Sequence, residues 1–114
     1  MALRGLLMYE DWLDLWEFDV DRCRGAGATG RLFAPRETAR GFVRVQTQLV
    51  LDSDGREVTS SAHILMFADS PRIPAESRVV LPARFGGSTV DVVAEGVRDS
   101  GIESIPRYYR IDMA

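Results

Sequence analysis

The chain has 114 residues, a length that suits one domain with a single hydrophobic core. Hydrophobic residues make up 46% of it and charged residues 27%, and no apolar run approaches the ~20 residues of a membrane-spanning helix. The net charge is −3, and all 14 basic residues are arginine. This balance disfavours a protein that grips nucleic acid by neutralising phosphates. The composition predicts a globular domain that does not span a membrane.

The first element of the chain is ambiguous between a helix and a strand. A helical stripe of apolar residues fits the start of the chain, but "WLDLWEFD" also alternates between two faces. A helix would carry Asp14 and Glu17 toward its negative end, which is unfavourable. A strand from Trp12 to Phe18 is therefore the better interpretation. Residues 1–10 are expected to form a flexible N-terminal arm.

A glycine-rich segment follows, in which Gly25-x-Gly27-x-x-Gly30 has the letter pattern of a dinucleotide-binding loop. Such a loop needs a buried parallel strand before it and a helix after it, whose N-terminus holds the pyrophosphate. Only "RLFA" separates Gly30 from Pro35, which leaves no room for that helix. Residues 20–39 are therefore predicted to be a long mobile loop that binds no nucleotide.

The clearest periodicity lies in the middle of the chain. Alternating apolar and polar residues from Val43 to Leu51 predict a half-buried strand. The stretch "DSDG" that follows is a turn, because glycine accepts a positive φ at little cost. A second run, from Glu57 to Phe67, begins with small polar residues and ends in the apolar "HILMF". The two runs predict a long hairpin with a buried base and an exposed tip.

Proline and glycine divide the remainder into short strands. The stretch "SRVVLP" predicts a strand that Pro82 stops, "STVDVVAEGV" predicts another, and "RYYRIDM" predicts the last. The predicted fold class is all-β: a small β-barrel of about six short strands in one domain, residues 1–114, with a long hairpin between the second and third strands. The predicted core consists of Val43, Val45, Leu49, Ile64, Val79, Val90, Val92 and Ile111.

No convergent set of catalytic groups can be named, so the chain is not expected to be an enzyme. His63 is the only histidine and Cys23 the only cysteine, whereas a zinc site takes three or four such ligands. A Ser/His/Asp site is defined by geometry and not by proximity in sequence, so a structural role is favoured for His63. The acidic group from Glu10 to Asp21 matches no calcium loop and is interpreted as a solvated face. The sequence predicts no cofactor and no metal.

Several stretches resemble one protein family in their order along the chain. They are "DWLDLWEFD", "RGFVRVQ", "GREVTSSAHILMFAD", "IPAESRVVLP", "VDVVAEGVRD" and "IPRYYRID". Over about residues 10–112, the chain resembles the head-to-tail stopper, or head-completion, proteins of long-tailed bacteriophages, above all those of actinobacteriophages. The most specific parts are "REVTSSA" and "IPAESRV", and the absence of lysine fits a GC-rich host.

The resemblance implies a ring, expected to hold six copies, between the portal and adaptor complex above and the tail terminator and tail tube below. It implies assembly in the host cytoplasm, a final place in the neck of the virion, and transient non-specific contact with packaged double-stranded DNA. In the family, the loop between the second and third strands closes the DNA channel, and by position this loop is residues 46–61. The residues implied to line the channel are Gln46, Gln48, Asp52, Asp54, Arg56, Thr59, Ser60 and Ser61.

Three alternatives stay open. The tight "DSDG" tip departs from relatives that have a longer loop, so the closure geometry of the family does not carry over; separately, either residues 20–39 or residues 46–61 could face the channel. The chain could be another head–tail joining component, namely an adaptor or a tail terminator. It could also be a small OB-like binding module, which would need a basic groove with stacking aromatic residues.

Overall fold

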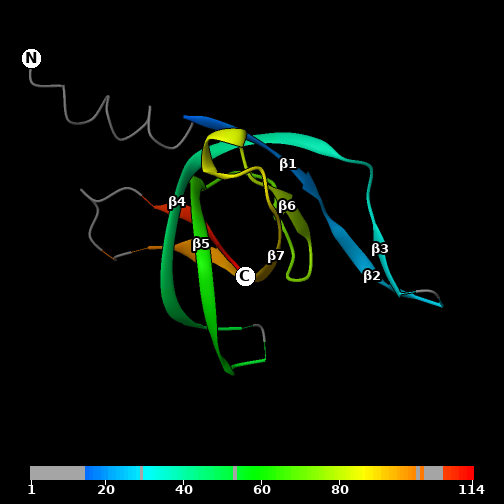
Figure 1. The fold of residues 1–114 in the computed structure, drawn as a ribbon. Coiled ribbons are helices and arrows are strands. Elements are labelled where there is room, and N and C mark those ends of the chain that lie inside the picture. The colour runs from blue at the N-terminus through cyan, green and yellow to red at the C-terminus, as the bar shows by residue number, and fades with distance from the viewer. Residues whose placement is uncertain (1–14, 29, 53, 100, 102–106) are drawn as a thin grey trace, which may run out of the picture.

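The computed structural model describes residues 15–28, 30–52, 54–99, 101 and 107–114. Within these ranges the fold is built almost entirely of strands (Figure 1). The elements are β1 (Trp16–Asp21), β2 (Cys23–Gly27), β3 (Gly30–Phe33), β4 (Glu37–Leu51), β5 (Glu57–Phe67), β6 (Arg78–Val80), the 3-10 helix η1 (Ala83–Phe85), β7 (Thr89–Arg98) and β8 (Tyr108–Met113). Among the described residues, no helix has the length and apolar character needed to cross a membrane.

Six of the strands close an antiparallel barrel in the order β1-β4-β5-β8-β7-β6. The barrel closes at β1, which pairs with β4 on one side and with β6 on the other. Phe18 lies opposite Ala39 across the first pair, and Val20 lies opposite Val79 across the second. The predicted all-β class and small barrel are therefore confirmed, and the long predicted hairpin is β4–β5.

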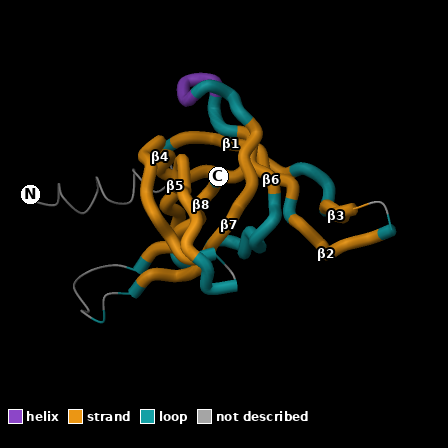
Figure 2. The backbone as a smooth tube through the Cα atoms, turned by 60° about the horizontal axis from the view of Figure 1, so that its bottom comes forward, coloured by secondary structure: helices purple, strands orange, loops and turns teal. Residues whose placement is uncertain are grey.

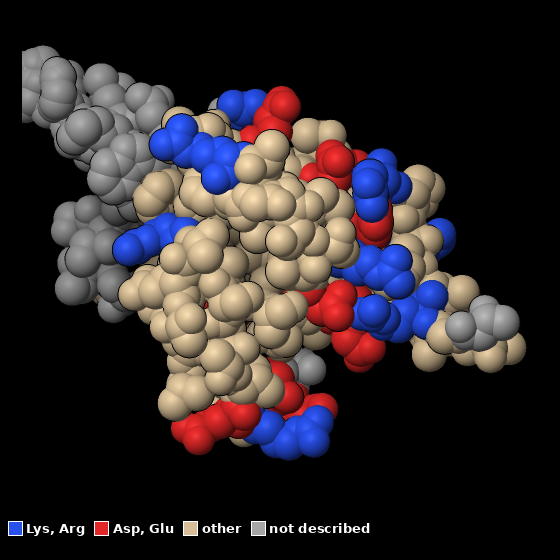
Figure 3. All heavy atoms as spheres, viewed as in Figure 1, with Lys and Arg blue, Asp and Glu red and all other residues tan. Residues whose placement is uncertain are grey.

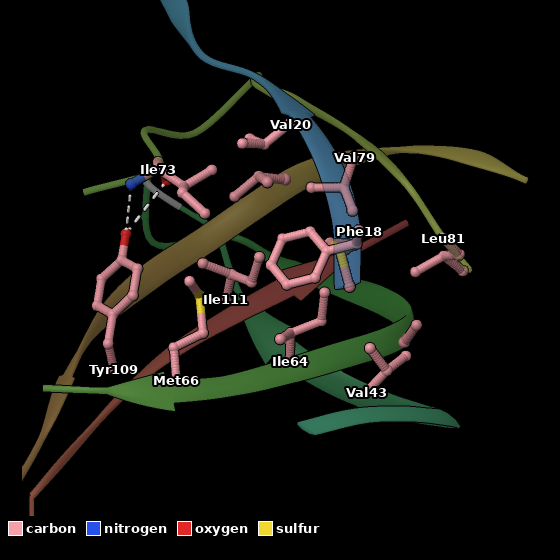
Figure 4. Packing of buried hydrophobic residues seen from close by; sticks show 13 residues of the cluster. Phe18, Val20, Val43, Ile64, Met66, Ile73, Val79, Leu81, Tyr109 and Ile111 are labelled. Atoms are coloured by element: carbon pink, nitrogen blue, oxygen red, sulfur yellow. Dashed lines mark hydrogen bonds between the residues drawn. The ribbon is translucent and has the colours of Figure 1, made fainter. Parts of the chain in front are cut away.

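The hydrophobic core fills the barrel, and every barrel strand contributes to it (Figure 4). Five predicted core residues are buried: Val43, Ile64, Val79, Val92 and Ile111. Val90 is half-buried and packs against them. The other members of the cluster are Phe18, Val20, Ala62, Met66, Ile73, Leu81, Tyr109 and Met113.

Two predicted core positions are wrong. Val45 is 60% exposed, and Leu49 is 70% exposed. The register of β4 against β5 shifts between Val45, which lies opposite Ala62, and Gln48, which lies opposite Ser60. This β-bulge adds a residue to β4 and reverses its alternation, so Leu49 leaves the row of Val43. Val45 keeps that row and lies opposite buried Ala62, but it stands at the start of the bulge and is exposed.

The prediction of a mobile loop over residues 20–39 is also wrong. Residues 20 and 21 end β1, residues 37–39 begin β4, and β2 and β3 pair as a separate two-stranded sheet between them. Backbone hydrogen bonds, and not a buried face, hold these two strands together. Their sequence therefore needs no alternating apolar pattern, and none is present to predict them. The first strand begins at Trp16, and the predicted positions Trp12 to Asp14, like the arm over residues 1–10, lie outside the described residues.

Gly41 allows β4 to pass very close to β5. A Cβ atom at this position would lie 2.6 Å from Cγ2 of Ile64 and 2.8 Å from the backbone oxygen of Leu65. Both distances are shorter than van der Waals contact, and the second involves an atom fixed by the sheet. The barrel can therefore close here only around a glycine.

Tyr109 ties the loop before β6 to the inside of the barrel (Figure 4). Its hydroxyl accepts a hydrogen bond of 2.7 Å from the backbone N–H of Ile73 and donates one of 2.6 Å to Glu95. The guanidinium of Arg72 holds both oxygens of Glu95, at 2.9 and 2.6 Å. Burial, and then the bond to Glu95, raises the pKa of Tyr109 to about 12. A core residue thus satisfies a buried backbone donor.

Candidate functional site

The β4–β5 hairpin extends beyond the barrel (Figure 1), and its outer end points toward the viewer in Figure 2. β4 has 15 residues, but β1 pairs with it only up to Gly41. Similarly, β8 pairs with β5 only from Ala62 onward. We call residues 45–61 the outer hairpin. In the described part of the chain, its two strands have only each other as ladder partners over this range.

The two faces of the outer hairpin differ in their exposure. One row carries half-buried Val50 and Val58 and buried Ser60, together with half-buried Gln48. The opposite row is exposed throughout and consists of Leu49, Leu51, Glu57 and Thr59. Leu49 is 70% exposed and Leu51 is 60% exposed. The outer hairpin therefore presents two leucines to solvent on one face of a projecting sheet, an arrangement that favours burial against another molecule.

Most charged groups in the turn of the outer hairpin form hydrogen bonds or ion pairs within the turn itself. A carboxylate oxygen of Asp52 accepts hydrogen bonds of 2.9 Å from the backbone N–H groups of Asp54 and Arg56, and Gly55 adopts a φ of 81°. The bond from Arg56 is the main cause that holds the pKa of Asp52 below its ordinary value of 3.8. The Arg56 side chain pairs with Asp52 at 3.8 Å and with Asp54 at 3.3 Å. These three predicted channel residues therefore build the turn.

The inner row anchors the outer hairpin to the barrel. Oε1 of Gln48 accepts a hydrogen bond of 2.6 Å from Arg110, which also holds buried Asp112 at 2.8 Å. The Ser60 hydroxyl is fully buried and bonds to the backbone oxygens of Ala62 and Met113. Gln48 and Ser60 thus have partners within the chain. Of the predicted channel residues without charge, Gln46, Thr59 and Ser61 are the exposed ones.

Two hollows lie between the outer hairpin and the barrel. The first, of about 400 Å³, is lined by Val50, Leu51, Asp52, Ala75, Ala94, Glu95 and Arg98. The second, of about 360 Å³, adds Arg31 and Asp91 to residues of the turn. Both mix carboxylates with arginines, and within the described ranges no group of His, Cys, Asp and Glu side chains is placed to hold a metal ion.

A second projection comes from the segment that was predicted to be a loop. We call β2 and β3, Cys23–Phe33, the finger. Gly25 lies opposite Leu32 and Gly27 opposite Gly30, and the Leu32 side chain lies against Gly27, where a Cβ would be 3.0 Å away. Leu32 is 50% exposed. The three glycines therefore form a narrow hairpin, and no helix follows them that could hold a pyrophosphate.

The base of the finger is fixed to the barrel by specific bonds. The Cys23 N–H donates to the buried Ser77 hydroxyl at 2.8 Å, and Nε of Arg22 donates to the backbone oxygen of Arg72 at 2.8 Å. Arg31 reaches back to the backbone oxygen of Glu76 at 2.9 Å and to Asp91 at 3.4 Å. The sequence did not predict this element. Its one visible feature was an excess of positive charge, four arginines without any acidic residue across residues 22–36.

His63 occupies a structural position, as predicted. It is 3% exposed, lies between Arg44 and Asp112 in the sheet, and its Nδ1 has no hydrogen-bond partner among the described residues. Burial, and then the charge of Arg110, lowers its pKa from the ordinary value of 6.5. An imidazole buried between two sheet neighbours fits a structural role.

Comparisons with protein families, with curated proteins and with solved structures found no match for this chain. The class that its fold and surface define is a small closed β-barrel with two projections that are hydrogen-bonded to it, the outer hairpin and the finger.

Proposed function

We propose that the chain is a structural neck protein of a long-tailed bacteriophage, of the head-to-tail stopper kind. Several copies, six by the resemblance, form a ring between the portal and adaptor complex and the tail terminator and tail tube. Their outer hairpins close the DNA channel after packaging. The observation that carries this proposal is the outer hairpin itself, a projection from a closed barrel with Leu49 70% exposed. A symmetric ring supplies a neighbour that covers such a face.

The charge of the outer hairpin suits a channel that DNA must leave. Its one arginine, Arg56, is paired with two aspartates of the same turn. Gln46, Thr59 and Ser61 are exposed and uncharged. Each unpaired cation would bind a phosphate and release counterions, which would add affinity and slow DNA exit. A gate made of this surface holds DNA by obstruction and not by tight binding.

The alternatives find less support. An adaptor of the mainly helical kind disagrees with a described chain whose one helix, η1, has three residues. An OB-like module would need open aromatic faces for stacking bases. Instead, arginine guanidinium groups stack on Phe33 at 4.3 and 5.4 Å and on Trp16 at 4.7 Å. A tail terminator is the remaining alternative. It predicts that mutant heads retain their DNA but no longer join tails.

The test is the retention of DNA in tailless heads of a phage that carries this gene. Replacing Leu51–Glu57 by Asn-Gly shortens the outer hairpin without removing a core residue. We expect these heads to lose DNA and to become sensitive to nuclease. The double substitution Asp54→Asn and Arg56→Gln is the control, since it keeps the length and net charge of the turn.

Two outcomes would count against the proposal. If heads with the shortened hairpin protect their DNA as well as wild type, then the outer hairpin is not the gate. If DNA is retained but the heads no longer join tails, then the chain acts as a tail terminator.

A further inference from the structure

The finger and the outer hairpin leave the barrel in different directions. In Figure 1 the outer hairpin ends below the barrel and the finger extends to the right, and of the finger only Arg31 lines a hollow with the turn of the hairpin. Among the described residues of one copy, no hydrogen bond or ion pair joins the finger to the outer hairpin. Two different surfaces that meet only between copies generate a head-to-tail contact, which closes into a ring when the rotation permits.

The two surfaces carry opposite charge. Residues 22–36 contain Arg22, Arg24, Arg31 and Arg36 and no acidic residue, whereas residues 45–61 contain Asp52, Asp54 and Glu57 against Arg56 alone. Figure 3 shows carboxylates next to basic side-chain atoms at the end of the hairpin, and arginines with carboxylates among them on the side of the finger. Most of these charges are paired within the chain. The side chains of Arg24 and Glu57 are exposed, and neither has a hydrogen bond or an ion pair among the described residues.

Both surfaces also carry an exposed apolar residue. Leu32 is 50% exposed on the finger, and Leu51, directly opposite Glu57 in the hairpin, is 60% exposed. The finger has only small side chains at Ala26, Gly27 and Ala28, so it can approach another backbone closely. Apolar contact can thus supply affinity, and the Arg24–Glu57 pair can set the orientation.

We propose that the finger of one copy docks on the exposed row of the outer hairpin of the next copy, in a head-to-tail contact that repeats around a ring. Leu32 packs against Leu49 and Leu51, and Arg24 pairs with Glu57. This contact deepens the proposed function by naming the interface of the ring. It uses only surfaces of this chain, so purified protein tests it independently of any role in the phage neck.

Site-directed disulfide formation between two different copies tests the contact. In a Cys23→Ser background, one variant carries Ala26→Cys in the finger, and a second, marked by a mass tag, carries Thr59→Cys in the outer hairpin. Both positions are exposed. On mixing and mild oxidation we expect mixed dimers in excess over both homodimers. The control replaces the finger cysteine by Ala83→Cys on η1, an exposed position outside both surfaces.

Charge reversal provides the second arm of the test. Arg24→Glu in the finger variant should reduce the yield of mixed dimers about two- to fivefold, as expected for loss of one exposed ion pair. Glu57→Arg in the hairpin variant should do the same, and combining the two reversed variants should restore the yield. Neither side chain supports the fold, so the barrel should keep its thermal midpoint.

Three results would overturn the proposal. The first is a mixed-dimer yield no higher than with the Ala83→Cys control. The second is an excess of Thr59→Cys homodimers, which would mean that the hairpins face each other, and the third is a failure of the double reversal to restore the yield.

Discussion

Replacing Gly41 with alanine should destabilise the barrel by more than any other single methyl group added to a described strand glycine. The new Cβ would lie 2.6 Å from Ile64 Cγ2, 2.9 Å from Met66 Cγ and 2.8 Å from the backbone oxygen of Leu65. Relieving such overlap in a packed core costs about 3 kcal/mol. Lower entropy of the unfolded chain offsets about 0.7 kcal/mol of this. The net loss is about 2 kcal/mol.

Thermal unfolding followed by circular dichroism measures this loss. For 114 residues, 1 kcal/mol corresponds to about 4 °C in the midpoint, so Gly41→Ala should lower the Tm by about 8–10 °C. Gly96→Ala in β7 is the matched control, since a Cβ there meets no atom within 4 Å. It should leave the Tm unchanged or raise it by a few degrees. Equal midpoints for the two variants would refute the close approach of β4 and β5 at Gly41.

The remaining predictions concern an exposed residue, a buried hydroxyl and a buried titratable group. Val45→Asp should change the free energy of unfolding by less than about 0.5 kcal/mol in urea titrations, because Val45 is 60% exposed; a loss above 2 kcal/mol would place it in the core. Tyr109→Phe should cost about 1–3 kcal/mol in the same assay, since it leaves the Ile73 N–H without its partner. Because the folded pKa of His63 is lowered from 6.5, the unfolded chain takes up the proton first, so stability should fall as pH drops below about 6.5. Unfolding at pH 8 and pH 5 should show a smaller difference in His63→Asn than in wild type, and an equal difference would contradict the burial of a neutral imidazole.

Alternation in the sequence predicted most of the barrel because the barrel has one buried face per strand. In β8, Tyr109, Ile111 and Met113 alternate in sequence and are all buried. The turn at Gly55 followed from the chemistry of "DSDG" alone. The face on which β4 residues lie beyond Val45 could not be predicted. The β-bulge there changes the backbone register but leaves the alternating residue pattern unchanged.

The candidate site was predictable only in part. The hairpin and its exposure at the tip followed from the polar residues around it, but the burial of Ser60 depends on the end of β8, far away in sequence. The finger was not foreseen at all. Its strands contain Gly25, Gly27 and Gly30, which carry no side chain to create a pattern, and its position depends on Ser77 and Asp91 of other segments.

Closure of the barrel at β1 has a consequence for how the molecule opens. The seam between β1 and β6 consists of three residue pairs, from Asp19–Val80 to Asp21–Arg78, whereas β5 and β8 share six. Each seam pair joins residues far apart in the chain, so its loop-closure entropy is large and it should form late during folding. The hairpin of β4 and β5 forms from neighbouring residues and should come first. The β1–β6 seam is therefore where the barrel should unfold locally first. Its amide hydrogens should exchange with solvent sooner than those of β5 and β8.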